Sequence, residues 1–301
     1  MAEGVAVTTD EQPVVVERRS GRLFGILHLP AERRGVAVVF LSSGLQNRAG
    51  PHRMYVKAAR RFAEDGFLSL RLDLPGVGDS AARPLEANFD CHDPEPVADA
   101  LALLAERYGV ERIVLLGLCA GARVAMKAAA RNPRVEAVVA WSSPIVSGPV
   151  NMPVAKGGGA YMGRTQAKNQ LREWAPKLVN PAAWYRLLGG KGVRAGWGMM
   201  RRALSGLLPE RLRARSDRQS DFFRSVEACT AQRRRMLFVY GEEDTVARAE
   251  LAERYPDIAT GRVATCEYVV VPQGDHTFTR VAATDAAIAA TAAWLVRVFP
   301  A

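Results

Sequence analysis

One short segment, residues 114–122, constrains the fold of this chain more than any other. It reads Val-Leu-Leu-Gly-Leu-Cys-Ala-Gly-Ala, so an apolar, strand-like run ends in Gly-x-Cys-x-Gly, and an Ala-rich, helix-prone stretch follows. The glycines let a strand and a helix pass closely, while the turn holds its central residue in a strained conformation. This pattern is typical of a nucleophile elbow, with Cys119 as the nucleophile. The alternative is that Cys119 is a small buried apolar residue.

Strand-like and helix-like segments alternate on both sides of the elbow. The predicted strands are residues 14–17, 22–29, 36–42, 67–74, 112–116, 135–141, 236–240 and 266–271. The predicted helices are residues 53–65, 94–108, 123–131, 247–255 and 282–298. Apolar strands that alternate with helices indicate a mostly parallel sheet covered by helices on both faces.

This alternation stops between about residues 144 and 233, where glycines interrupt short helical pieces. Residues 1–144 and 234–301 are therefore predicted to form the core, and residues 145–233 an inserted helical cap. Residues 151–220 carry fourteen Lys or Arg against three Asp or Glu, although the whole chain has a net charge of only +10. The cap is either a solvated, arginine-rich face or a docking surface for an acidic or phosphorylated partner. No helix-turn-helix, zinc or RNA-binding signature points to nucleic acid.

Composition indicates a soluble globular protein, because 49% of the residues are apolar and 24% are charged. There is no uninterrupted run of eighteen apolar residues and no apolar core near the N-terminus, so we expect neither a membrane span nor a signal peptide. Four scattered cysteines indicate reduced thiols in a cytoplasmic protein. The scattered histidines predict no metal site, and the glycine spacing does not suit a dinucleotide, so no cofactor is expected.

A thiol nucleophile needs a base, and the base needs an acid to orient it. The chain has four histidines, and His276 alone follows Cys119, as the order nucleophile, acid, histidine requires. The acid should follow the preceding strand, in residues 241–245. Asp244 is the predicted acid and Glu243 the alternative, whereas Asp275 is interpreted as a loop or cap residue.

The catalytic turn also needs N–H donors for a tetrahedral oxyanion. The backbone of Ala120, directly after the nucleophile, is one predicted donor, and the backbone of Leu45, in the loop after the third strand, is the other. Four polar side chains crowd this loop and its continuation. They either bind a polar acyl group or a phosphate, or are simply solvated: Gln46, Arg48, His52 and Arg53.

Taken together, these motifs resemble the α/β-hydrolase superfamily over nearly the whole chain. Residues 73–80, Asp-Leu-Pro-Gly-Val-Gly-Asp-Ser, match its structural Asp-x-x-Gly-x-Gly-x-Ser turn. The resemblance implies an α/β-hydrolase fold with a mostly parallel eight-stranded sheet, helices on both faces and an inserted helical cap.

A narrower resemblance rests on residues 44–53, 117–121 and 275–278. These motifs are similar to the hydrolases associated with exosortase A clusters and to carrier-protein-dependent acyltransferases of natural-product biosynthesis. Both groups have cysteine at the elbow, which implies Cys119, Asp244 and His276 as the triad. Ala120 departs from the first group, which often has an acidic or hydroxyl residue there.

Three hypotheses for function follow. In the first, Cys119 takes an acyl group from a carrier-protein or coenzyme A thioester, whose phosphopantetheine belongs to the donor, and passes it to an alcohol or amine. The basic cap would suit an acidic acyl carrier protein. In the second, the same triad serves a thioesterase or esterase, with water as the acceptor. In the third, the chain is a non-enzymatic binding module, which would be indicated by an inert Cys119.

Overall fold

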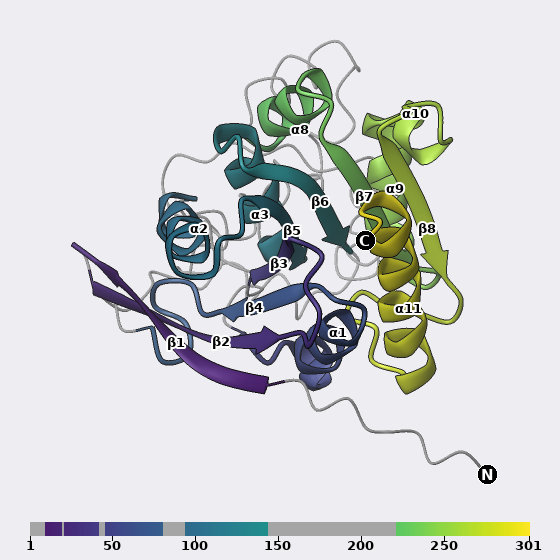
Figure 1. The fold of residues 1–301 in the computed structure, drawn as a ribbon. Coiled ribbons are helices and arrows are strands. Elements are labelled where there is room, and N and C mark those ends of the chain that lie inside the picture. Colours follow the sequence, from purple (N-terminus) through teal and green to yellow (C-terminus); the bar gives the residue numbers. More distant parts are fainter. Residues whose placement is uncertain (1–9, 20, 42–45, 81–93, 144–220) are drawn as a thin grey trace, which may run out of the picture.

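The computed structural model describes residues 10–19, 21–41, 46–80, 94–143 and 221–301 (Figure 1). The strands are β1 (Asp10–Arg18), β2 (Gly21–Leu29), β3 (Val36–Leu41), β4 (Leu68–Leu72), β5 (Arg112–Leu118), β6 (Val135–Trp141), β7 (Arg235–Gly241) and β8 (Cys266–Val271). The helices are the 3-10 turn η1 (Pro51–Arg53) and α1 (Met54–Glu64), α2 (Glu95–Tyr108), α3 (Ala120–Arg131), α8 (Asp221–Ala231), α9 (Thr245–Arg254), α10 (Pro256–Ala259) and α11 (Val281–Val298).

The eight strands form one sheet in the order β1-β2-β4-β3-β5-β6-β7-β8. The pairs β1–β2 and β2–β4 are antiparallel, and every other neighbouring pair is parallel. The mostly parallel eight-stranded sheet of the α/β-hydrolase fold is therefore confirmed. Because parallel strands end at a common edge, the segments after β5, β7 and β8 meet at one side of the sheet.

Helices cover both faces of this sheet, as Figure 1 shows: α2, α3 and α8 lie on one face, and α1 and α11 lie on the other. Each face has its own apolar cluster. All six residues of β3 are buried, since a central parallel strand faces helices on both sides. This explains why the central strands appear in the sequence as continuous apolar runs.

Helix α8 lies within the range predicted as cap, yet it packs into the core. Its Phe222, Val226 and Cys229 belong to the apolar cluster on the α3 face. The Cys229 thiol lies 3.7 Å from the carbonyl oxygen of Met126 in α3. Residues 221–231 thus extend the core, and residues 144–220, the rest of the predicted cap, lie outside the described residues.

Helix α11 is long and apolar enough to cross a membrane by length and composition, with a mean hydropathy of 1.4 over its 18 residues. In the fold it lies against the sheet, where Ala287, Ala292 and Leu295 are buried in the apolar cluster. Of this window 44% is buried inside the fold, and the core helix of a globular protein meets the same criteria of length and composition.

Candidate active site

The turn between β5 and α3 has the strained geometry that the sequence predicts. Cys119 has φ 53° and ψ −118°, a positive φ that side chains rarely adopt. A side chain at Gly117 would overlap the backbone of Gly121 and Ala122, so the strand and helix pass too closely for any residue but glycine. The Cys119 N–H donates to the carbonyl oxygen of Trp141 at 2.9 Å, which ties the turn to β6. The thiol is therefore held at the carboxyl edge of the sheet.

His276 and Asp244 come to the same edge from the loops that follow β8 and β7. The His276 Nδ1 atom lies 2.8 Å from Asp244 Oδ2, and the His276 ring is also hydrogen-bonded to the Cys119 thiol. Asp244 is buried, with 7% of its side chain exposed, whereas His276 is 41% exposed. The structure thus brings the three residues of the predicted triad into one chain of hydrogen bonds.

The environment of His276 favours its protonated form. Burial lowers its pKa, but the hydrogen bonds to Asp244 and Cys119 and the charges of both partners outweigh burial and raise the pKa to about 10. An imidazolium between a carboxylate and a thiolate is the charge arrangement expected of a cysteine nucleophile paired with histidine.

The loops that carry Asp244 and His276 cross at two glycines. A side chain on Gly241 would overlap the backbone of Gly274 and Asp275. The Glu243 N–H donates to the Gly274 carbonyl oxygen at 2.8 Å, and the Gln273 N–H donates to the Glu242 carboxylate at 2.9 Å. This crossing fixes the position of Asp244 relative to His276.

The other carboxylates considered as the partner of His276 bind other groups. Glu243 pairs with Arg280 at 2.6 Å and is exposed. The Asp275 carboxylate accepts the N–H groups of Thr277 at 3.1 Å and Thr279 at 2.8 Å, which makes it a cap within its own loop. Asp244 is therefore the carboxylate of this group that contacts His276.

Of the two predicted oxyanion donors, Ala120 is placed and Leu45 is not. Ala120 is the first residue of α3, where a helix has no internal partner for its N–H groups. Its N–H is thus available beside Cys119. Leu45 lies outside the described residues.

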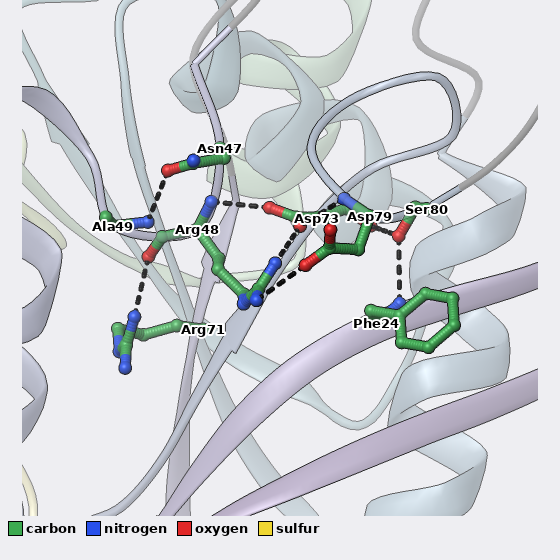
Figure 2. Close-up of polar contacts among 8 residues, drawn as sticks. All are labelled: Phe24, Asn47, Arg48, Ala49, Arg71, Asp73, Asp79 and Ser80. Carbon is green, nitrogen blue, oxygen red and sulfur yellow. Dashed lines mark hydrogen bonds and ion pairs between the residues drawn. The ribbon is translucent and has the colours of Figure 1, made fainter.

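Arg48 is engaged by carboxylates of the protein itself (Figure 2). Its guanidinium pairs with the fully buried Asp73 carboxylate and lies 2.7 Å from the Asp79 carboxylate. Its backbone N–H also donates to the Asp73 carboxylate, at 2.5 Å. Ser80 continues the network, since its hydroxyl donates to the Asp73 carbonyl oxygen and accepts the Phe24 N–H, both at 2.8 Å. The Asp-x-x-Gly-x-Gly-x-Ser turn therefore anchors the loop after β3, and Arg48 serves that anchor in the structure.

The other predicted substrate-binding side chains lie on the surface. Gln46, His52 and Arg53 are exposed, and His52 and Arg53 both have left-handed backbone conformations, with φ of 49° and 59°. These three side chains remain available to a substrate.

Sequence analysis did not single out Tyr55, whose hydroxyl contacts both β3 and the elbow. In the sequence it appears as one apolar position of helix α1, and no local motif marks its role. Among the described residues no group of three or more His, Cys, Asp or Glu is arranged to hold a metal ion. Within the described part of the chain, Cys119, Cys229 and Cys266 form no disulfide bond.

A strained turn, a buried acid and a histidine at the carboxyl edge of this sheet define the α/β-hydrolase class. The comparisons agree: residues 38–294 match the alpha/beta hydrolase family, and the chain belongs to this family. No curated protein matches the chain.

Solved structures with the same fold include a dienelactone hydrolase from Anabaena variabilis, with 16% identity, a TM-score of 0.60 and coverage of 96% of this chain and 98% of that one. An esterase from Pyrococcus furiosus has 16% identity, a TM-score of 0.60 and coverage of 96% and 93%. A serine hydrolase without a lid from Xanthomonas campestris has 13% identity, a TM-score of 0.56 and coverage of 98% and 97%.

Proposed function

We propose that the protein is an acyltransferase that takes an acyl group from a thioester and passes it through an acyl-Cys119 intermediate to an alcohol or amine. The observation that carries this proposal is the hydrogen-bonded chain from Cys119 through His276 to Asp244. Cys119 is the proposed nucleophile, His276 the acid and base, and Asp244 the group that orients the imidazole and stabilises its charge.

In the first half-reaction the Cys119 thiolate adds to the carbonyl carbon of the donor thioester. The N–H of Ala120 stabilises the resulting oxyanion. Collapse of this intermediate breaks the bond to the donor sulfur, and the His276 imidazolium gives its proton to the departing thiolate. The products are a free thiol, a neutral His276 and acyl-Cys119.

The second half-reaction begins with a change in charge. Acylation removes the Cys119 thiolate, one of the partners that hold the His276 pKa at about 10, so neutral imidazole becomes more stable. Neutral His276 accepts the proton of the acceptor as its oxygen or nitrogen attacks the acyl carbon. Cys119 leaves as the thiolate and the imidazolium is restored.

Two arguments support a thioester donor. Exchange between a thiolate and a thioester joins groups of similar leaving ability, so a cysteine nucleophile suits this donor. The basic segment 151–220 would favour an acidic acyl carrier protein or the phosphates of coenzyme A. A separate argument concerns the acceptor. The proposed cap would exclude water, so that an alcohol or amine attacks the acyl group instead.

The second candidate is a hydrolase that uses the same residues with water as the acceptor. It is favoured by the dienelactone hydrolase and the esterase among the structures of the same fold. Both candidates share the first half-reaction and differ in the fate of acyl-Cys119.

The test is intact-protein mass spectrometry after incubation with acyl-carrier and acyl-coenzyme A thioesters. We expect an acyl adduct on the native chain and on Cys266→Ala, a control at a buried thiol whose pKa is raised by burial, and no adduct on Cys119→Ala. An adduct that persists in water and is released by an alcohol or amine supports transfer. Release of free acid supports the hydrolase, and an adduct on Cys119→Ala would exclude both mechanisms.

A further inference from the structure

A buried phenol stands between β3 and the elbow. The Tyr55 hydroxyl, delivered by α1, donates to the carbonyl oxygen of Leu41 at 3.0 Å and accepts the N–H of Leu118 at 2.8 Å. Leu41 is the last residue of β3, and Leu118 directly precedes Cys119. One oxygen atom thus touches both strands where they reach the active-site edge.

The strand register shows which ladder position this oxygen contacts. Strands β3 and β5 are parallel and their last aligned pair is Leu41 with Gly117. In a parallel ladder a hydrogen bond from the Leu118 N–H to the Leu41 carbonyl oxygen flanks such a pair. The Tyr55 hydroxyl contacts both of these groups. A side-chain oxygen therefore links the two strands at the point where the turn with Cys119 begins.

Packing holds the Tyr55 ring in one place. Its centroid lies 5.3 Å from that of Phe40 and 6.2 Å from that of Trp141, and the side chain is fully buried. A side chain at Gly50 would come within 2.8 Å of the ring, so glycine is needed there. Burial raises the pKa of Tyr55, which keeps the hydroxyl protonated and able to donate.

We propose that Tyr55 is a positioning residue that sets the elbow against the end of β3, so that the Ala120 N–H faces the oxyanion formed at Cys119. This inference rests on the proposed function. Without the hydroxyl, the Leu118 N–H loses an acceptor and the Leu41 carbonyl oxygen loses a donor. This loss lets the turn shift against β3, and a displacement of about 1 Å costs on the order of 100-fold in rate.

The test compares two reactions of the same thiol in Tyr55→Phe, which keeps the ring and removes the oxygen. Alkylation of Cys119 by iodoacetamide displaces iodide and forms no oxyanion, whereas acylation by a thioester or p-nitrophenyl acetate forms one. We expect the acylation rate to fall about 10- to 100-fold, through kcat more than KM, with the alkylation rate within about 2-fold of native.

Thr291→Val is the matched control, because the Thr291 hydroxyl is also buried, donates to Ala287 at 2.8 Å and accepts from Trp141 at 3.0 Å. We expect it to lower the thermal midpoint as Tyr55→Phe does while both reactions stay at native rates. Equal loss of both reactions in Tyr55→Phe, or loss of neither, overturns the positioning role. Failure of the native chain to acylate while its thiol alkylates would overturn the proposed function instead.

Discussion

At the scale of single residues, the proposed mechanism makes the reactivity of Cys119 depend on the charge state of His276. The hydrogen bonds to Asp244 and Cys119 raise the His276 pKa to about 10 against the opposing effect of burial, so the imidazolium persists from acidic pH up to that value. Over this range the positive charge favours the thiolate at Cys119. Above about pH 10 the imidazole is neutral and this help is lost.

His276→Ala tests this charge pairing. An ordinary thiol is only about 1% thiolate at about pH 6.5, because its pKa is about 8.5. We expect the variant to be alkylated by iodoacetamide roughly 10- to 100-fold more slowly than the native chain at about pH 6.5, and the gap to close as the pH approaches about 9. Rates followed by intact mass over this pH range check the expectation. Parallel pH profiles for the two chains would contradict it.

Asp244 and Glu243 offer a matched pair of substitutions on the acid. Asp244→Asn keeps the shape of the side chain but removes the charge that His276 contacts at 2.8 Å, whereas Glu243→Gln removes the charge of an exposed partner of Arg280. We expect kcat to fall by roughly 10²- to 10⁴-fold in Asp244→Asn, because the imidazolium loses its buried counterion and its fixed tautomer.

Steady-state kinetics on a thioester would show the contrast between the two acids. The Glu243→Gln variant should stay within about 3-fold of native, since loss of an exposed ion pair has little effect. A larger loss in Glu243→Gln than in Asp244→Asn would assign the acid to Glu243.

At the scale of elements, the crossing of the loops after β7 and β8 holds Asp244 and His276 together. A methyl group at Gly241 would overlap the backbone of Gly274, so Gly241→Ala must push the His276 loop away. We expect kcat to fall about 100-fold and the free energy of unfolding to drop by about 1–3 kcal/mol.

Gly109→Ala is the control for this crossing, because Gly109 has φ +66° with nothing within 4 Å of an added methyl group. It should lose about 1 kcal/mol of stability through backbone strain and keep its kcat. Equal kcat in both variants would show that the crossing does not position the triad. Denaturant unfolding and steady-state kinetics supply the two measurements.

The same elements show which parts of the molecule could be predicted from the sequence. Strands such as β3 and β5 are continuous apolar runs, and the Gly-x-Cys-x-Gly turn is a local pattern, so both were accessible. Helix α8 was assigned to the cap because its apolar face has no local signal for its packing against α3. The sequence also does not predict contacts between distant segments, such as Arg48 with Asp73 or the Tyr55 hydroxyl with Leu41 and Leu118. These contacts form only when the strands are aligned in the sheet, so no local pattern marks them.

At the scale of the whole molecule, the charge distribution separates two kinds of donor. Residues 151–220 hold fourteen Lys or Arg against three Asp or Glu, while the chain as a whole has a net charge of +10, so the rest is close to neutral. A concentrated positive field accelerates encounters with an acidic protein about 10- to 1,000-fold at low ionic strength, but leaves an uncharged small molecule unaffected.

Salt therefore distinguishes a carrier-protein donor from a small thioester. We expect kcat/KM for an acyl carrier protein to fall at least about 10-fold between about 0.05 and 0.5 M NaCl, because screening shortens the Debye length. With an acyl-N-acetylcysteamine thioester, which carries the same acyl group without the charge, kcat/KM should change less than about 2-fold over this range. Reversal of four arginines to glutamate within 201–213 should reproduce the effect of salt at low ionic strength for the carrier protein alone. Equal salt dependence for both donors would assign the basic segment to solvation and leave the carrier-protein partner without support.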